Sequence, residues 1–201
     1  MGVNVYPTKG NLVAAKRTLA LSQTGFELLD KKRGVLVMEM MRYIERAEDI
    51  QSRIGGAFER AYKALLQAEM ATGTFAHIDA AVPVDDGLHV SSRSVMGVEL
   101  PILRTDDAPP RLTYGFLSTN SKLDEAYIEF RNVKKLLVEL AEIENSVYRL
   151  ASAIKKTKVR ANSLQNIVIP RLTETIKFIT ESLEEKEREE FSRLKVIKGR
   201  L

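Results

Sequence analysis

Two histidines and two pairs of adjacent aspartates are the residues of this sequence whose types could support metal or acid–base chemistry. They are His77 and His89, Asp85-Asp86 and Asp106-Asp107. Neither histidine has another histidine four residues away, which is the spacing that lets one helix face hold a zinc ion. Adjacent aspartates and Asp-Gly also favour turns, because the short carboxylate bonds to nearby backbone groups. We therefore expect turn or surface roles at these positions and no metal site.

Motifs for nucleotide or nucleophilic chemistry are missing from the sequence. It contains no G-x-x-x-x-G-K-[ST] loop to cradle a phosphate and no G-x-S-x-G elbow to present a serine. It also contains no cysteine, so neither a disulfide framework nor a thiolate metal site is possible. The sequence therefore predicts no catalytic residue and no cofactor, and it favours a non-enzymatic function.

The strongest structural pattern in the sequence is a heptad repeat in its N-terminal third, before the histidines and paired aspartates. Two rows of positions, offset by three residues, are apolar at sixteen of their eighteen members. The rows are Leu12, Leu19, Phe26, Arg33, Met40, Ala47, Ile54, Ala61 and Ala68, and Ala15, Ser22, Leu29, Leu36, Tyr43, Ile50, Ala57, Ala64 and Ala71. Such spacing predicts a left-handed coiled-coil helix over residues 8–72. Gly55-Gly56 lies inside it, and we expect it to allow close helix packing.

A second heptad occupies the C-terminal part of the chain. Its rows are Ala126, Val133, Leu140, Val147, Ile154, Ala161 and Val168, and Leu136, Ile143, Leu150, Thr157 and Leu164. Ser121 and Asp124 have the spacing of a capping box at a helix start. Pro170 lacks an N–H and crowds the preceding turn, so the helix should bend there. We predict a second coiled-coil helix over residues 119–198, bent near Pro170.

Residues 73–118 form a connector rich in glycine and proline. Within it, Leu88–Val95 alternates in part between apolar and polar residues, as a half-buried strand does. Met96-Gly97 can turn the chain into a second strand, in which Pro101 indicates an edge position. The sequence predicts a β-hairpin at about 88–103, standing off the coiled coil.

Two long helices joined by a compact connector should pair antiparallel, with partner residue numbers that add to about 192. The C-terminal helix then runs past its partner from about residue 181. The fold prediction is an all-α, long antiparallel two-helix left-handed coiled coil with a short β-hairpin in the connector.

Candidate partner-binding residues fall into three groups. The basic residues are Lys31, Lys32, Arg33, Lys155, Lys156, Lys158 and Arg160, the hairpin turn residues are Met96, Gly97 and Val98, and the tip residues are Phe191, Leu194 and Lys195. The basic side chains either extend into water or form a collar that faces an acidic surface. The apolar tip either frays or lies in a sleeve provided by a partner.

Charge and hydropathy limit the partners further. The net charge is only +4, with 27 acidic residues interleaved among 31 basic ones, whereas nucleic-acid binding requires bases gathered on one face. No apolar run approaches the roughly 20 residues that span a bilayer. The N-terminus lacks the features of a signal peptide. We expect a soluble, cytoplasmic protein with no nucleic-acid partner and no direct bilayer insertion.

Three stretches of the sequence together resemble one protein family. They are Pro7-Thr8-Lys9 with Leu12, Lys16, Leu19, Gly25, Leu28-Leu29 and Lys31-Lys32-Arg33; Ser94-Val95-Met96-Gly97-Val98 with Pro101; and Arg160-Ala161-Asn162-Ser163-Leu164 with Ile169-Pro170-Arg171-Leu172, Leu183-Glu184-Glu185 and Arg188–Lys195. In this order on a heptad scaffold they resemble the D subunit of V-type and archaeal-type rotary ATPases. The chain stops soon after Lys198, as expected of a bacterial or archaeal member.

The resemblance implies a central rotor shaft. Its partners would be the A and B subunits of the catalytic ring, the F subunit on the side of the coiled coil, and the funnel-shaped subunit (d/C) that leads to the proton or sodium ring. It also implies a position at the cytoplasmic face of the membrane, within the soluble sector of the ATPase. The alternative is a coiled-coil RNA-binding arm or a holdase chaperone. If the chain binds RNA, its phosphate contacts should weaken steeply with salt.

Overall fold

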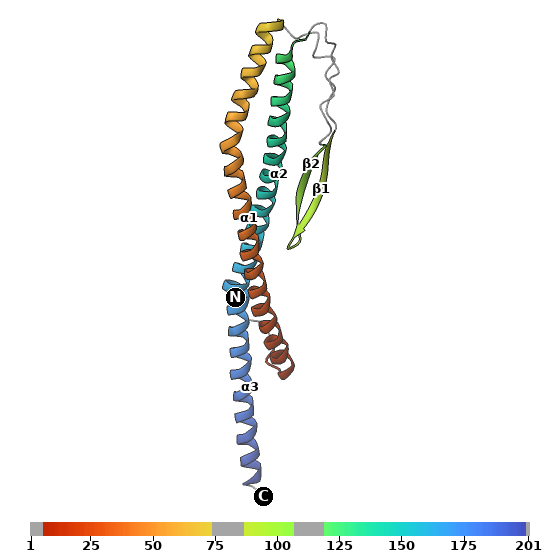
Figure 1. Cartoon of the computed structure of the whole chain (residues 1–201). Helices are drawn as coiled ribbons and strands as arrows, with labels where there is room; N and C mark the ends of the chain where they lie inside the picture. Colours follow the sequence, from red (N-terminus) through yellow and green to blue (C-terminus); the bar gives the residue numbers. More distant parts are fainter. Residues whose placement is uncertain (1–5, 74–86, 107–118, 200–201) are drawn as a thin grey trace. The chain divides into compact units, whose positions relative to one another are not determined.

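The computed structural model describes residues 6–73, 87–106 and 119–199. The N-terminal helix α1 spans Lys9–Thr72, and the strands β1 (Leu88–Val95) and β2 (Val98–Thr105) follow it (Figure 1). The C-terminal helices are α2 (Ser121–Ser163) and α3 (Ile169–Lys198), joined by a π-helical segment, η2 (Leu164–Val168). The predicted coiled-coil fold with one antiparallel hairpin is confirmed. His77, Asp85-Asp86, Asp107 and most of the predicted connector lie outside the described residues.

Contacts divide the chain into two units. Unit 1 comprises Met1–Gly34 and Ile154–Leu201, and unit 2 comprises Val35–Ala153. In unit 2, the buried hydrophobic residues of α1 and α2 are heptad positions: Leu36, Tyr43, Ile50, Ala57, Ala61, Ala64, Ala68, Ala126, Val133, Ile143 and Leu150. Removing a large aliphatic side chain from water contributes about 1.5–3 kcal/mol. The heptad seam is therefore the hydrophobic core of this unit.

The helices of unit 2 pair in the register that the sequence predicts. Ala57 and Ala61 of α1 form a buried cluster with Val133 of α2. Tyr62 packs edge-on against Phe130, with ring centroids 5.5 Å apart. The numbers of these partners add to close to 192, so α1 and α2 run antiparallel.

Unit 1 pairs the first part of α1 with the end of α2, η2 and α3. Leu164 lies beside Gly25, where an added Cβ would be 3.9 Å from the leucine Cδ1. Ala161 and Ile179 are buried, and Lys9 Nζ lies 3.0 Å from Glu187 Oε1 in an exposed ion pair. From Glu184 to Gly199 every residue is exposed, so this stretch has no packing partner within the described chain.

The C-terminal helical run changes geometry just before its proline. Residues Leu164–Val168 adopt the π form, and Pro170 follows in the first turn of α3. Proline has no N–H to donate and its ring crowds the carbonyl of the residue four positions earlier, here Asn166. A π segment is a common accommodation of such a disturbance in the ladder. The predicted single helix is therefore an α–π–α run.

The hairpin closes through a two-residue loop. Met96 and Gly97 have φ values of 51° and 76°, and positive values at both central residues define a type I′ turn, whose twist suits a hairpin. Val95 pairs with Val98, and the register continues to Leu88 opposite Thr105. The hairpin thus extends two residues past the predicted end at 103.

Two local predictions are wrong. A Cβ added at Gly55 would meet no atom within 4 Å, and one at Gly56 would meet only the end of the Arg60 side chain, so this pair does not serve close packing within the chain. The second is the capping box with Ser121 at the N-cap. Ser121 is the first residue of α2, so Asn120 occupies the N-cap position, and the Ser121 hydroxyl bonds to the Asn120 side chain.

Ser146 provides a test of the packing beside the seam. Its side chain is fully buried, and its hydroxyl has no hydrogen-bond partner among the described residues. Ser146→Ala should raise the free energy of unfolding by about 1 kcal/mol or more, because a buried unpaired hydroxyl is removed. The control is Ser52→Ala, on an exposed hydroxyl bonded to Asp49, which changes only helix propensity and that local bond. Equal effects in urea unfolding would contradict the packing.

Candidate functional site

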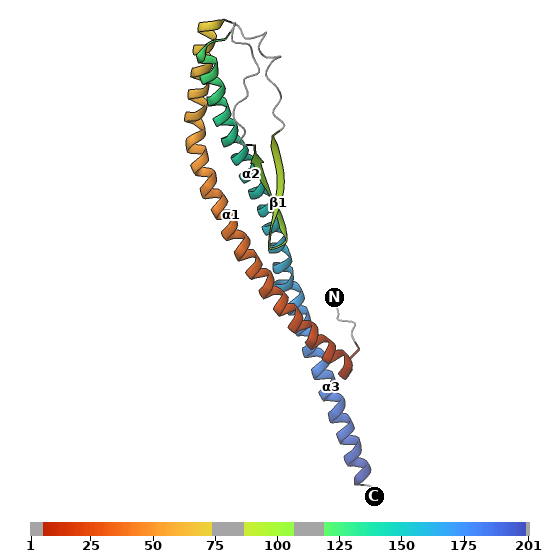
Figure 2. The same ribbon diagram turned by 45° about the vertical axis from the view of Figure 1, so that its right-hand side comes forward.

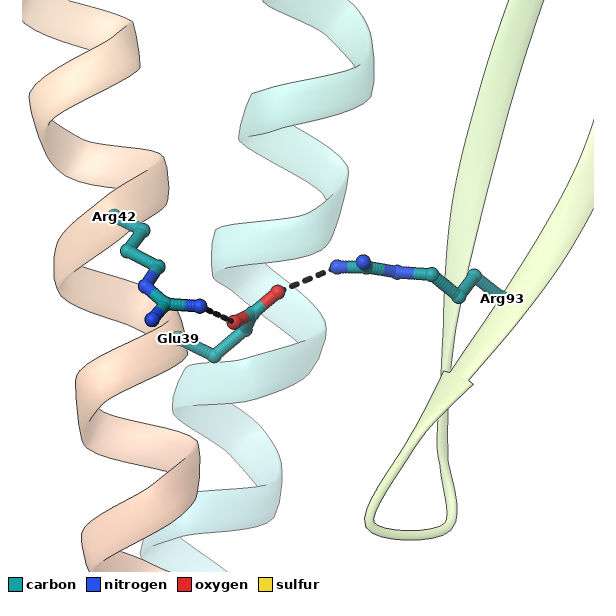
Figure 3. A network of polar contacts seen from close by, with 3 residues as sticks. All are labelled: Glu39, Arg42 and Arg93. Carbon is teal, nitrogen blue, oxygen red and sulfur yellow. Dashed lines mark hydrogen bonds and ion pairs between the residues drawn. The ribbon is translucent and has the colours of Figure 1, made fainter.

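The hairpin packs on the coiled coil of unit 2. Leu100 of β2 is fully buried, and Arg93 of β1 forms an ion pair with Glu39 of α1 (Figure 3). Arg93 and Leu100 are cross-strand partners, so they share the face of the hairpin that meets the helices. The expectation that the hairpin stands off the coiled coil is therefore wrong.

Glu39 connects α1 with the hairpin through two arginines. One carboxylate oxygen accepts from Arg93, and the other lies 3.4 Å from Arg42 Nη1 on the same helix (Figure 3). The Glu39 side chain is only 15% exposed, so the pair is shielded from water on one side. Burial acts to lower the pKa of the Arg93 guanidinium, but Tyr43 and Glu39 outweigh it and raise the pKa above its usual value. Arg93 is therefore held in its charged form.

The outer edge of β2 is capped by side chains of α2. The Leu103 N–H donates to Glu142 Oε2 at 2.8 Å, and Arg149 Nη1 donates to the Glu99 carbonyl at 3.0 Å. Residues 142, 146 and 149 are four and three positions apart, so they lie on one helix face. The burial of Ser146 follows, since it lies between the two side chains that contact β2.

The predicted turn residues lie at the end of this docked hairpin. Met96 is 51% exposed, Gly97 is exposed and Val98 is half-buried. A methionine in the left-handed region costs roughly 1–2 kcal/mol relative to an ordinary conformation. Its flexible apolar side chain is well suited to contact a partner surface. The partner-binding role of these three residues remains a prediction.

The predicted basic residues all belong to unit 1. Lys31, Lys155, Lys156, Lys158 and Arg160 are exposed, whereas Lys32 and Arg33 are half-buried. The antiparallel register fixed by Gly25 and Leu164 brings the two basic runs opposite each other. Arg33 pairs with Asp30; in the described part of the chain, the side chains of the other six form no ion pair or hydrogen bond. We call these six residues the basic band.

The predicted tip residues lie on the exposed end of α3. Phe191, Leu194 and Ile197 are 68%, 65% and 58% exposed, and Lys195 is exposed. Arg188 and Arg193 make ion pairs along the same helix with Glu184, Glu185 and Glu189. We call Phe191, Leu194 and Ile197 the tip stripe. An apolar stripe that is exposed in the isolated chain is typical of a partner-binding surface.

The candidate chemical residues form no reaction centre within residues 6–73, 87–106 and 119–199. His89 Nε2 lies 3.3 Å from Asp106 Oδ1, and both side chains are exposed. Over the same ranges, no three histidine or acidic residues gather as a metal would require. No described helix is long and apolar enough to cross a membrane.

The sequence did not single out Glu39, Arg93, Glu142 or Arg149, which hold the hairpin. Their partners lie 39 to 54 residues away along the chain, and no local pattern specifies such pairs. The only signal in the sequence was Glu142, Ser146 and Arg149 on one helix face, with a small residue between two long charged ones.

The fold defines a coiled-coil protein whose exposed basic and apolar surfaces are candidates for docking. A family model that describes the D subunit of ATP synthase matches residues 11–199. The D subunit of the V-type ATP synthase of Thermotoga neapolitana is 41% identical over 201 residues, covering 99% of each chain. The D subunit of the A-type ATP synthase of Pyrococcus furiosus is 37% identical over 99% of this chain and 95% of its own. That of Methanosphaera stadtmanae is 38% identical over 98% and 94%.

The chain belongs to the D-subunit family of ATP synthases. The match includes both heptads, the hairpin and the tip, so the resemblance noted in the sequence is confirmed.

A double-mutant cycle tests the contact between Glu39 and Arg93. Replacing each by alanine, singly and together, should give a coupling energy of about 1 kcal/mol in the exchange protection of the β1–β2 amides, because the carboxylate is mostly buried. The matched control is the exposed pair Asp49–Arg53, for which about 0.3–0.5 kcal/mol is expected in global unfolding. Coupling near zero at Glu39–Arg93 would contradict the docked arrangement.

Proposed function

We propose that this chain is the central rotor shaft of a V-type or A-type ATP synthase, coupling ATP hydrolysis or synthesis in a ring of A and B subunits to proton or sodium translocation. The observation that carries the proposal is the tip stripe on an end of α3 that has no packing partner within the described chain. Membership in the D-subunit family gives that surface a host, since the chain is one subunit of a larger complex.

The proposed mechanism is mechanical. A helix whose apolar stripe is buried along a heptad seam resists bending and unwinding, because either motion would expose the stripe to water. Such an element can bias which catalytic site of a ring is closed, and a change at one site then changes the others. The chain itself supplies no reacting group in this proposal, and it lies at the cytoplasmic face of the membrane without entering it.

The tip stripe suits a turning contact. Apolar contacts have little directionality, so an apolar collar at the top of the A and B ring can centre the helix without fixing one orientation. The basic band suits an electrostatic contact with an acidic surface of the ring, because six cations without partners in the described chain gain from opposite charge.

The remaining partners are assigned to the middle and the foot of the shaft. The F subunit binds the side of the coiled coil, and Met96, Gly97 and Val98 are the candidate contacts at the hairpin. The funnel-shaped subunit (d/C) receives the foot and passes rotation to the membrane ring. The RNA-binding arm and the holdase are disfavoured, since the family match extends over nearly the whole chain.

Removing the tip tests the proposed host. Truncation after Leu183 should weaken assembly with the A and B ring at least tenfold and lower coupled ion pumping, while thermal unfolding of the isolated chain changes little because residues 184–199 are exposed. A full-length variant with Phe191, Leu194 and Ile197 changed to serine should behave like the truncation. Its control, with Glu190 and Arg193 changed to glutamine, should assemble normally. Normal coupling in the serine variant would show that the tip is only a solvated end.

Charge reversal tests the basic band. The double variant Lys155→Glu with Lys158→Glu should weaken ring assembly by about tenfold at 0.1 M salt, and the loss should shrink as salt rises, because exposed charges are screened over about 10 Å. The matched control reverses Lys16 and Lys63, which are exposed lysines outside the band and also form no ion pair in the described chain. If both double variants assemble equally well, the band is a solvated surface.

A further inference from the structure

The two outer edges of the hairpin differ. Val95 and Val98 close a two-residue loop, so residues 89, 91, 93 and 95 of β1 exchange hydrogen bonds with β2, and residues 88, 90, 92 and 94 direct their N–H and C=O groups outward. The same alternation applies to β2, where the outward C=O of Glu99 accepts from Arg149 and the outward N–H of Leu103 donates to Glu142. One edge is therefore capped by α2.

The outer edge of β1 is open. Figures 1 and 2 both show β2 between β1 and α2, and every residue from Leu88 to Ser94 is exposed. Among the described residues, the outward backbone groups of Leu88, Val90, Ser92 and Ser94 have no hydrogen-bond partner. Alternate residues of β1 therefore offer unpaired N–H donors and C=O acceptors at the spacing with which a neighbouring β-strand would pair.

The β1 edge lacks three of the devices that normally prevent strand addition, and its inward-pointing charge, Arg93, is paired with Glu39. Natural edge strands carry lysine, proline or a bulge; β2 has Pro101 and its cap, but β1 has none of these. The residues on its outer face are Leu88, Val90, Ser92 and Ser94, of which Leu88 and Val90 are 43% and 69% exposed. Arg93 and His89 lie on the other face, where Arg93 pairs with Glu39 and His89 Nε2 lies 3.3 Å from Asp106 Oδ1.

We propose that the outer edge of β1 is a docking site for an extended segment of another subunit, which adds to the hairpin as a third strand. The inference rests on the proposed function, because it takes the occupant from the same assembly. An extended backbone is the ligand that matches alternating outward N–H and C=O groups. The occupant carries apolar side chains beside Leu88 and Val90, which are exposed on the outer face of β1.

A second copy of this chain fits the edge poorly. Antiparallel pairing of two β1 strands would bring together two chains that each carry a net charge of +4. One eight-residue edge also buries far less than the roughly 1,200–2,000 Å² of a stable complex. The occupant must be held to this chain by further contacts as well, as a neighbouring subunit in a complex is.

Amide hydrogen exchange tests the edge directly. In the free chain, the inward amides of residues 91, 93 and 95 should be protected, and those of 90, 92 and 94 should exchange freely. In the complex reconstituted with the other ATP synthase subunits of the same host, exchange at 90, 92 and 94 should slow at least tenfold. Unchanged exchange at these three amides in an assembled complex would overturn the proposal and leave the proposed function standing.

A proline variant separates the backbone from the side chain. Ser92→Pro removes one outward N–H and leaves the inward ladder bonds intact, as Pro101 already does at the opposite position. It should weaken incorporation into the complex about tenfold, whereas Ser92→Ala, which keeps the N–H, should not. Protection at 91 and 93 verifies the hairpin, and Ser94→Pro replaces the variant if that protection is lost.

The remaining outcomes are also decisive. Equal incorporation of Ser92→Pro and Ser92→Ala, with the hairpin intact, would overturn the added strand. Protection of 90, 92 and 94 in the free chain that rises with its concentration would assign the edge to a second copy instead. Failure of the unmodified chain to enter the complex would overturn this proposal together with the proposed function.

Discussion

The structure depends on a single buried seam between paired helices. Each helix has one apolar stripe, so each can bury one face only, and the buried hydrophobic residues of α1 and α2 in unit 2 coincide with the heptad rows. Small residues such as Ala57, Ala61 and Ala68 fill part of that seam, with few aromatic rings beside them. A thin core of this kind places most of the chain at the surface. Contact surfaces, and not an enclosed site, are what this fold can offer.

Three such surfaces differ in chemistry. The basic band offers charge, the tip stripe offers apolar area without direction, and the β1 edge offers directed hydrogen bonds. Charge attracts over several ångströms and falls with salt, apolar contact permits sliding, and a β-ladder fixes register. A shaft that turns within one partner while staying fixed to another needs both permissive and fixed contacts. The proposed assignments follow this distinction.

The hairpin is held mainly by polar groups. Leu100 is its only fully buried residue among those described, and Arg93, Glu142 and Arg149 supply hydrogen bonds to or from the helices. Glu142 and Arg149 bond one N–H and one C=O on the edge of β2 that a two-stranded sheet would otherwise leave open. The same contacts turn β1 outward, so the docking of one edge determines the exposure of the other.

The sequence by itself determined the helices, their pairing register and the turn of the hairpin, because heptad spacing and the Met96-Gly97 turn are local properties of the chain. It also located the basic band and the tip stripe, whose residues are neighbours along one helix or follow from the register. The tertiary structure decided that the hairpin docks on the coiled coil, that Ser146 is buried, and that Gly55 faces open space. The docking of the hairpin depends on pairs such as Glu39 and Arg93, which are 54 residues apart in the sequence. No periodicity encodes such pairs, because each is chosen by the geometry with which a strand edge meets a helix face.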